Sequence, residues 1–346
     1  MHETNLQASP VPTASAHAVS VPNGQPVATS FPVAHTFGVK APATLRVAGF
    51  DRPGPLTPAA HTDYRFRSRC LSDLLAWYRS RCSGQTPDGL WITGPMGAGK
   101  SSLVIETAAR LNLNLIQVTA RRRLELADLI GHLTVLGGDV LFQDGPLTTA
   151  LRQGWWLLIN EVDLIDPGEL AGLNTLLDGG PLVLAENSGE VVPAAPGFGV
   201  ICTANTAGNG DRDGLYLGSQ RMNAALMDRF MLLTVDYPSP ADEQAVLAQR
   251  YPKLPEPLRD NMIEVANEVR RLFRGEAGDT ALPAIELTFS TRTLMRWAGL
   301  ALCFRDAPQP LSYALDRALL YRAEPETRAA IHGIVQRVFG ETPATP

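Results

Sequence analysis

Apolar positions along the first two thirds of the chain form short runs that alternate with helix-like stretches. The apolar runs predict strands at residues 90–93, 115–119, 155–159, 199–203 and 231–235. The stretches between them predict helices at residues 69–81, 101–111, 124–130, 147–153, 169–177 and 221–227. Because strands and helices alternate, the pattern predicts a parallel five-stranded sheet with right-handed crossovers and helices on its faces.

Two segments of this region predict small antiparallel hairpins. Residues 133–142 turn at Gly137-Gly138-Asp139, and residues 182–192 turn at Asn187-Ser188-Gly189. The glycine-rich stretch at residues 207–218 predicts a loop before the helix at 221–227.

The segment Pro238-Ser239-Pro240 marks a domain boundary, because only helical patterns follow it. These patterns predict helices at residues 241–250, 257–274, 291–304, 311–322 and 325–339. We therefore expect an α/β domain over residues 39–237 and an all-α lid domain over residues 238–346. Residues 1–38 are rich in Ala, Pro, Val, Ser and Thr with almost no charge, and they predict a flexible tail.

Composition and charge narrow the class of protein. The 346 residues are 45% hydrophobic and 19% charged, which is typical of a soluble globular chain that buries a sizeable core. A net charge of −5 makes a broad nucleic-acid footprint unlikely, and we read the basic run Arg121-Arg122-Arg123 as a solvated face or subunit contact. No apolar run approaches the roughly 18 to 20 residues of a membrane span. The four cysteines stand far apart without metal spacing, so the sequence predicts a cytoplasmic protein with reduced thiols.

One stretch carries a specific chemical signal. Its pattern is a glycine, four residues and then Gly-Lys-Ser, between a predicted strand and a predicted helix: Gly94-Pro95-Met96-Gly97-Ala98-Gly99-Lys100-Ser101. In that context the backbone N–H groups of such a loop cradle phosphates, and the helix that follows, starting with Ser101 and Ser102, adds a positive partial charge. We therefore predict that the loop binds ATP, with Lys100 at the β and γ phosphates and the Ser101 hydroxyl on Mg²⁺. A glycine-rich turn without a ligand is the disfavoured alternative.

Hydrolysis of a triphosphate also needs a carboxylate that activates water. The apolar run 155–159 ends in Asn160 and Glu161 at the carboxyl edge of the predicted sheet, which is where ligands of such sheets bind. Glu161 is the candidate general base. Asn160 stands where Asp is usual, so it keeps an acceptor oxygen for the metal site but loses the charge. We expect weaker Mg²⁺ affinity, with Asp163 as the nearest acid that could compensate.

Three more polar residues become candidates by their position. Asn205 ends the next apolar run, where it can polarise the attacking water or touch the γ phosphate. Arg229 and Arg292 carry guanidinium groups, which match the spread charge of a phosphoryl-transfer transition state. A lone arginine is more often a solvated surface group, so these two are candidates for the site only through their surroundings.

Together these residues resemble an AAA+ ATPase of the MoxR-like branch, and within it the CobS-like small ATPase subunit of aerobic cobaltochelatase. The most specific part of the resemblance is the run 204–211 with the later groups 214–216, 218–220 and 227–229. The resemblance implies an α/β domain with a helical lid, a homo-oligomeric ring of six subunits, and a von Willebrand A-type partner subunit. It also implies that Asn205 senses the nucleotide, that Arg229 reaches the ATP of a neighbouring subunit, and that Arg292 acts from the lid. The hairpins match inserts that face the pore or the substrate.

Two functions follow as hypotheses. One is an ATP-hydrolysing motor that remodels a partner protein, with a role in cobalt chelation resting on the resemblance alone. The other is a nucleotide-gated scaffold that binds ATP but hydrolyses it slowly, because Asn160 replaces the usual Asp. A small-molecule kinase gives Arg229 no role, and we set it aside.

Overall fold

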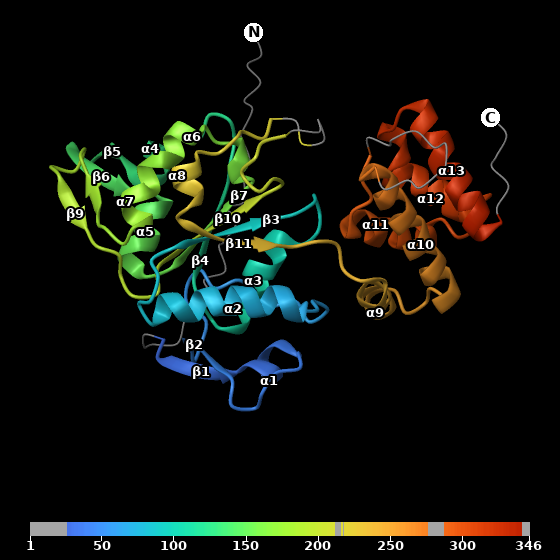
Figure 1. Cartoon of the computed structure of the whole chain (residues 1–346), viewed down its shortest axis with the longest axis horizontal. Coiled ribbons are helices and arrows are strands. Elements are labelled where there is room, and N and C mark those ends of the chain that lie inside the picture. Colours follow the sequence, from blue (N-terminus) through green and yellow to red (C-terminus); the bar gives the residue numbers. More distant parts are fainter. Residues whose placement is uncertain (1–25, 212–215, 217, 276–286, 341–346) are drawn as a thin grey trace, which may run out of the picture.

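A parallel sheet of five strands organises the first domain (Figure 1). The computed structural model describes residues 26–211, 216, 218–275 and 287–340. The strand order is β11-β3-β10-β7-β4, and the strands are β3 (Gly89–Thr93), β4 (Leu115–Thr119), β7 (Trp156–Asn160), β10 (Gly199–Ala204) and β11 (Phe230–Thr234). All four strand pairs are parallel, so the predicted five-stranded parallel sheet is confirmed.

Helices cover both faces of the sheet because its strands are apolar on both sides. One core packs α2 (Ser68–Cys82) and α3 (Lys100–Arg110) against one face. A second core covers the other face with the helices α4 (Leu126–Ile130), α5 (Pro146–Gln153), α6 (Pro167–Leu170), α7 (Asn174–Leu177) and α8 (Ala224–Met227). Two 3₁₀ turns, η1 (Val162–Leu164) and η2 (Ala171–Leu173), complete this layer.

The prediction of a flexible tail up to residue 38 was wrong for its last residues. Strand β1 (Ala28–Pro32) is followed by helix α1 (Val33–Phe37). Strand β1 pairs antiparallel with β2 (Arg46–Phe50). Val33 and Phe37 are buried in the core beside α2, and the Phe37 ring meets Phe66 edge-on at 5.0 Å between centroids. These elements are too short to show a period in the sequence, but their apolar side chains gain burial against a preformed face. Residues 1–25 of the predicted tail lie outside the described residues.

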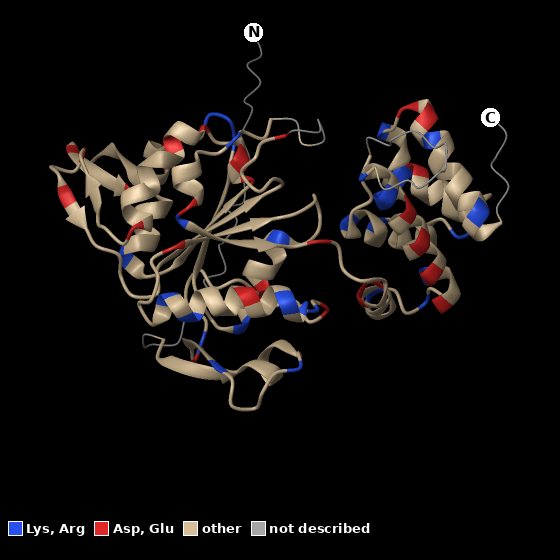
Figure 2. Cartoon of the chain, viewed as in Figure 1, with Lys and Arg blue, Asp and Glu red and all other residues tan. Residues whose placement is uncertain are grey.

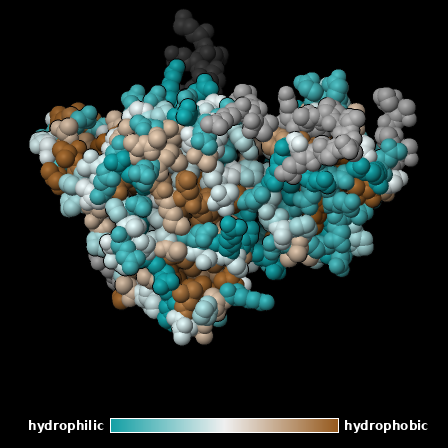
Figure 3. Space-filling model, viewed as in Figure 1, coloured by the Kyte–Doolittle hydropathy of each residue, from teal (hydrophilic) through white to brown (hydrophobic). Residues whose placement is uncertain are grey.

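Two antiparallel hairpins extend from the sheet domain, as predicted. The first consists of β5 (Gly131–Leu136) and β6 (Asp139–Asp144), and the second of β8 (Leu182–Leu184) and β9 (Glu190–Val192). The first hairpin exposes apolar side chains near its tip, with Val135 and Leu136 each 70% exposed. Figure 3 shows hydrophobic surface at the left edge of the molecule, where Figure 1 places these hairpins.

Two helices of this domain are shorter than the sequence pattern predicts. The predicted helix at 169–177 is broken into α6, η2 and α7, and Gly172 packs closely there, since a Cβ on it would lie 2.2 Å from Leu126. The predicted helix at 221–227 begins only at Ala224, because the Asn223 side chain caps it by accepting from the Ala225 N–H. Part of the predicted loop 207–218, namely residues 212–215 and 217, lies outside the described residues.

The second domain is all-α and has a core of its own (Figure 1). Its helices are α9 (Pro240–Arg250), α10 (Glu256–Phe273), α11 (Thr291–Cys303), α12 (Pro310–Ala318) and α13 (Pro325–Phe339), with the 3₁₀ turn η3 (Leu320–Arg322). Ser239 caps α9 and Ser290 caps α11 through their side chains, which fixes where both helices begin. None of the helices among the described residues is long and apolar enough to cross a membrane.

Candidate phosphate-binding site and its surroundings

The predicted phosphate loop connects β3 to α3 and has the backbone that only glycine adopts readily. Gly94, Gly97 and Gly99 have φ values of 146°, 73° and 93°. The loop is also tightly packed: a Cβ on Gly94 would lie 1.9 Å from the Val235 carbonyl oxygen, and one on Gly97 would lie 2.4 Å from the Ser290 Cβ. These glycines therefore fix the loop against β11 and the helical domain.

Lys100 points into this loop from the first turn of α3. Its ammonium donates to the carbonyl oxygens of Gly94 at 2.7 Å and Pro95 at 3.1 Å, and to Asn205 Oδ1 at 2.9 Å. Burial lowers the pKa of Lys100 to about 8, while the carboxylates of Asp163 and Glu161 oppose that shift. The contact with Asn205 joins the ends of β3 and β10, as their adjacent positions in the sheet allow.

Asn160 is the last residue of β7 and Glu161 follows it, at the same edge of the sheet. The Ser101 hydroxyl donates to Asn160 Oδ1, which also accepts from Thr203 Oγ1 at 3.3 Å. Glu161 is exposed, and it holds a left-handed backbone with φ 56°, a conformation that costs about 1 to 3 kcal/mol for a residue other than glycine. The structure thus brings together the loop, Asn160, Glu161 and Asn205.

The two candidate arginines lie apart from each other. Arg292, at the start of α11, lines a cavity together with Gly97, Ala98 and Gly99 of the phosphate loop. Arg229 precedes β11, and β11 runs parallel to β3 with Phe230 beside Gly89 and Thr234 beside Thr93. Arg229 is therefore at the amino edge of the sheet, a strand length of about 16 Å from the loop at about 3.3 Å per residue.

Arg229 forms its own contacts at that edge. Its Nε and Nη2 donate to the two carboxylate oxygens of Asp178 at 2.7 and 2.8 Å. The guanidinium is held on the surface of the chain and away from the phosphate loop. Of the two predicted arginines, Arg292 therefore lies beside the phosphate loop and Arg229 does not.

Comparison with known proteins finds two family matches in this chain. Residues 89–230 match the AAA domain (dynein-related subfamily), and residues 243–338 match the CbbQ/NirQ/NorQ C-terminal domain. The chain belongs to the AAA+ ATPases. Its two domain matches and its relatives place it in the MoxR-like branch, close to CobS.

The relatives of this AAA+ chain match most of its length. It is 29% identical over 323 residues to aerobic cobaltochelatase subunit CobS of Sinorhizobium sp, covering 90% of this chain and 91% of CobS. It is 29% identical over 252 residues to the denitrification regulatory protein NirQ of Stutzerimonas stutzeri, covering 72% and 84%. Protein NorQ of Paracoccus denitrificans is 30% identical over 177 residues, covering 51% and 62%.

A cavity of about 380 Å³ lies between the phosphate loop and the lid of this AAA+ protein. Besides the loop and Arg292, it is lined by residues of the segment 61–67. Arg67 of that segment donates to the Ala98 carbonyl oxygen at 2.8 Å, and it also donates to the Asp236 carbonyl oxygen. Arg67 could not be predicted from the sequence, because nothing in its local pattern places it over a loop some 30 residues later in the chain.

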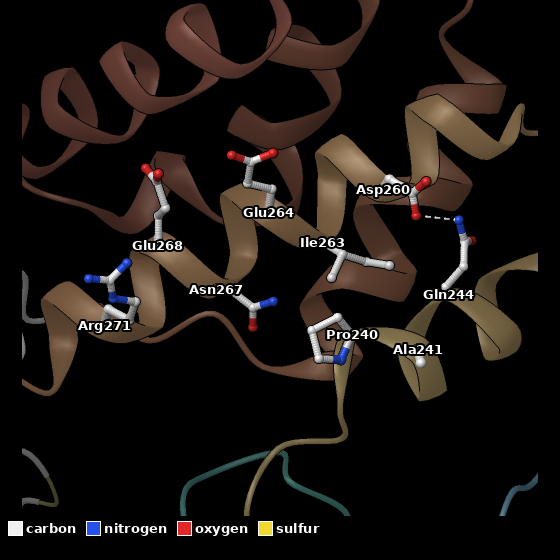
Figure 4. A pocket seen from close by; sticks show the side chains of 9 residues that line it. All are labelled: Pro240, Ala241, Gln244, Asp260, Ile263, Glu264, Asn267, Glu268 and Arg271. Carbon is white, nitrogen blue, oxygen red and sulfur yellow. Dashed lines mark hydrogen bonds between the residues drawn. The ribbon is translucent and has the colours of Figure 1, made fainter.

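A larger pocket of about 480 Å³ lies within the lid and contains none of these residues (Figure 4). Carboxylates of Asp260, Glu264 and Glu268 on α10 line it, with Gln244 on α9 hydrogen-bonded to Asp260. Arg271 also lines this pocket, but no residue of the phosphate loop does, so it is not the predicted nucleotide site. Elsewhere, Figure 2 shows acidic and basic residues interspersed over both domains.

Tyr237, the last residue before the lid, connects the phosphate loop to the lid. The Tyr237 hydroxyl donates to the Met96 carbonyl oxygen at 3.1 Å and lies 2.8 Å from Thr288 Oγ1. The Arg270 guanidinium stacks on the Tyr237 ring at 4.3 Å and forms a buried ion pair with Glu243. Since the Thr291 hydroxyl also donates to Glu243, at 2.7 Å, this buried pair holds the start of the helix that carries Arg292.

Proposed function

We propose that this chain is an ATP-hydrolysing motor that assembles into a ring of six subunits and remodels a partner protein. The observation that carries the proposal is the separation of the site into two halves. The phosphate loop, Glu161 and Asn205 meet at the carboxyl edge of the sheet, whereas Arg229 lies at the amino edge. A complete site needs Arg229 from a second copy, and head-to-tail contacts of that kind close into rings.

Each polar group has a chemical role in this proposal. Lys100 holds the β and γ phosphates, Glu161 takes a proton from the attacking water, and Asn205 orients that water or the γ phosphate. Arg292 contacts the phosphates from the lid side of the cavity, beside the loop. The neighbouring subunit's Arg229 would stabilise the charge that develops on the transferred phosphoryl group.

Ser101 and Asn160 are the residues that would hold Mg²⁺. Their two oxygens are in direct contact, and neutral oxygens of this kind suit a cation that keeps several waters. A Mg²⁺ ion held there would supply positive charge that offsets the charge of the phosphates.

The partner protein is proposed from the relatives and from the exposed hairpins. CobS is named as a cobaltochelatase subunit and NirQ as a denitrification regulator. For this chain we propose a von Willebrand A-type partner subunit, and a role in cobalt chelation as the narrower possibility. The apolar tip of the β5–β6 hairpin offers a surface for the remodelled protein.

A second candidate function is a nucleotide-gated scaffold with slow hydrolysis. Asn160 favours it, because its amide oxygen carries no charge to attract Mg²⁺ beside Ser101. The scaffold and the motor bind ATP alike and differ in turnover.

Steady-state ATPase activity at several protein concentrations separates the two functions. For the motor we expect turnover per subunit to rise with concentration until the ring has assembled. Asn160→Asp should then lower the Mg²⁺ concentration needed for half-maximal activity by roughly 10- to 100-fold, as changes beside metal ligands do. Tight binding of ATP without turnover, in the presence of the partner, would contradict the motor.

Binding of ATP should weaken at alkaline pH because of Lys100. Its pKa of about 8 means that the free site loses this positive charge above that pH, while bound phosphates favour the charged form. Binding then takes up a proton, so we expect the Kd for ATP to rise by up to about tenfold per pH unit above pH 8. Lys100→Arg, whose guanidinium stays charged, should lose most of this slope. Equal slopes for both proteins, measured by nucleotide titration from pH 7 to 9.5, would contradict the role of Lys100.

A further inference from the structure

We propose that Asp163 is a positioning residue that connects the phosphate-sensing Asn205 to the segment leading to Arg229. This inference rests on the proposed function, since it concerns how the two halves of the site communicate. Asp163 is fully buried, in the 3₁₀ turn directly after Glu161. A buried carboxylate is tolerated only where hydrogen-bond donors compensate for the lost water.

The donors to Asp163 come from two separate segments of the chain. Its Oδ2 accepts from the N–H groups of Asn205 at 3.0 Å and Thr206 at 3.2 Å, and from the Thr206 hydroxyl at 3.3 Å. The Ser219 hydroxyl donates to the same oxygen at 3.1 Å. One carboxylate oxygen therefore holds both the end of β10 and the segment that precedes α8.

The Ser219 side of this connection continues to Arg229. The Gln220 N–H donates to the Asp163 carbonyl oxygen at 2.6 Å, and the Met222 N–H donates to the Gly208 carbonyl oxygen at 2.9 Å. Asn223 then caps α8, a helix of only four residues that ends two residues before Arg229. A shift of Ser219 is thus passed along a short, hydrogen-bonded stretch to the arginine.

The Asn205 side of the connection begins at the phosphate loop. Asn205 accepts from the Lys100 ammonium at 2.9 Å, which is the group expected to bind the phosphates. A phosphate oxygen competes with Asn205 for that ammonium, and Asn205 is anchored through its backbone to Asp163. The presence or loss of the γ phosphate therefore acts on Asp163 through Asn205.

The second oxygen of Asp163 makes this connection adjustable. Its Oδ1 is buried and has no hydrogen-bond partner among the described residues, so all four donors share Oδ2. A carboxylate that only stabilised the loop would gain by dividing its donors between both oxygens. Rotation of the Asp163 carboxylate can move donors to the unused oxygen without exposing it to water.

The test uses two defective subunits that complement each other. Lys100→Ala subunits supply only Arg229, and Arg229→Ala subunits supply only a phosphate loop, so mixed rings contain complete sites. Ser219→Ala is then added to one or the other subunit. We expect it to lower kcat by about tenfold, the effect of one lost hydrogen bond to a charged group, only when it is in the subunit that supplies Arg229. Asp163→Asn should lower kcat in either subunit.

Controls separate this result from a loss of stability. Ser83→Ala removes a surface hydroxyl that donates to the Ser80 carbonyl oxygen at the end of α2, and it should leave kcat, KM and Tm unchanged. In the Ser219→Ala mixture KM for ATP should stay within about twofold, and Ser219→Thr should restore kcat, because it restores the hydroxyl. An equal loss of kcat with Ser219→Ala in either subunit, or no loss in either, would overturn the inference. An absence of activity in the unmodified mixture would instead count against the proposed function.

Discussion

Replacing Glu161 with glutamine is expected to lower ATP turnover by about 10²- to 10⁴-fold, the range that general-base catalysis contributes. Glutamine has nearly the same size and keeps an acceptor oxygen, but it cannot take the proton of the attacking water. The side chain is exposed at the carboxyl edge of the sheet, and its backbone N–H donates to Thr203 Oγ1 at 3.3 Å, so the change should not disturb the fold. Binding of ATP should persist, because among the described residues no hydrogen bond joins Glu161 to the phosphate loop.

The measurement is steady-state phosphate release alongside a nucleotide titration of the same protein. Glu326→Gln is the matched control, since Glu326 is an exposed acid in the first turn of α13. It should retain full turnover. Unchanged turnover in Glu161→Gln would show that another group activates the water, and Asp163 would not replace it readily because it is buried among its four donors.

Strands and the phosphate loop could be predicted because local patterns determine them. The run Leu90-Trp91-Ile92 is fully buried and apolar, and Gly94, Gly97 and Gly99 have backbones that the motif requires. Glu161 and Asn205 could be placed at one edge because parallel strands deliver their last residues to the same side. These inferences depend only on the order of strands and turns.

The features that could not be predicted from the sequence depend on contacts between segments that are far apart in the chain. Nothing near Arg67 indicates that its side chain crosses to Ala98, and nothing near Asp163 indicates that Ser219 donates to it from 56 residues away. The sequence predicts a tail for residues 28–37 because their burial depends on a face formed by α2. The local sequence predicts elements and turn chemistry, whereas such long-range contacts are set only when the elements pack.

Replacing Arg229 with alanine is expected to lower turnover by about 10³- to 10⁵-fold, the range for an arginine that acts across an interface. The expected cause is the loss of guanidinium donors at the neighbouring subunit's γ phosphate. Affinity for ATP should change little, because Arg229 lies at the opposite edge of the sheet from its own phosphate loop. Arg229→Lys should recover only a small part of the activity, since an ammonium lacks the two-donor fork that Arg229 now uses on Asp178.

Two controls test whether the effect belongs to Arg229 itself. Arg337→Ala removes another surface arginine that pairs with an acid, Glu268, and should leave turnover unchanged. Asp178→Asn weakens the pair that holds Arg229 on its own subunit, and it should keep or raise turnover in the assembled ring. Loss of activity in Asp178→Asn equal to that in Arg229→Ala would indicate that the pair matters for stability rather than for the neighbouring site.

Mixing Lys100→Ala with Arg229→Ala protein tests most directly whether each active site is shared between two copies of the chain. Each variant alone should be nearly inactive, because every site lacks either its lysine or its arginine. In an equal mixture, random assembly of a head-to-tail ring places an intact loop beside an intact Arg229 at about one interface in four. We predict that ATPase activity recovers to roughly that fraction of wild type. A mixture no more active than its two components would contradict the shared site.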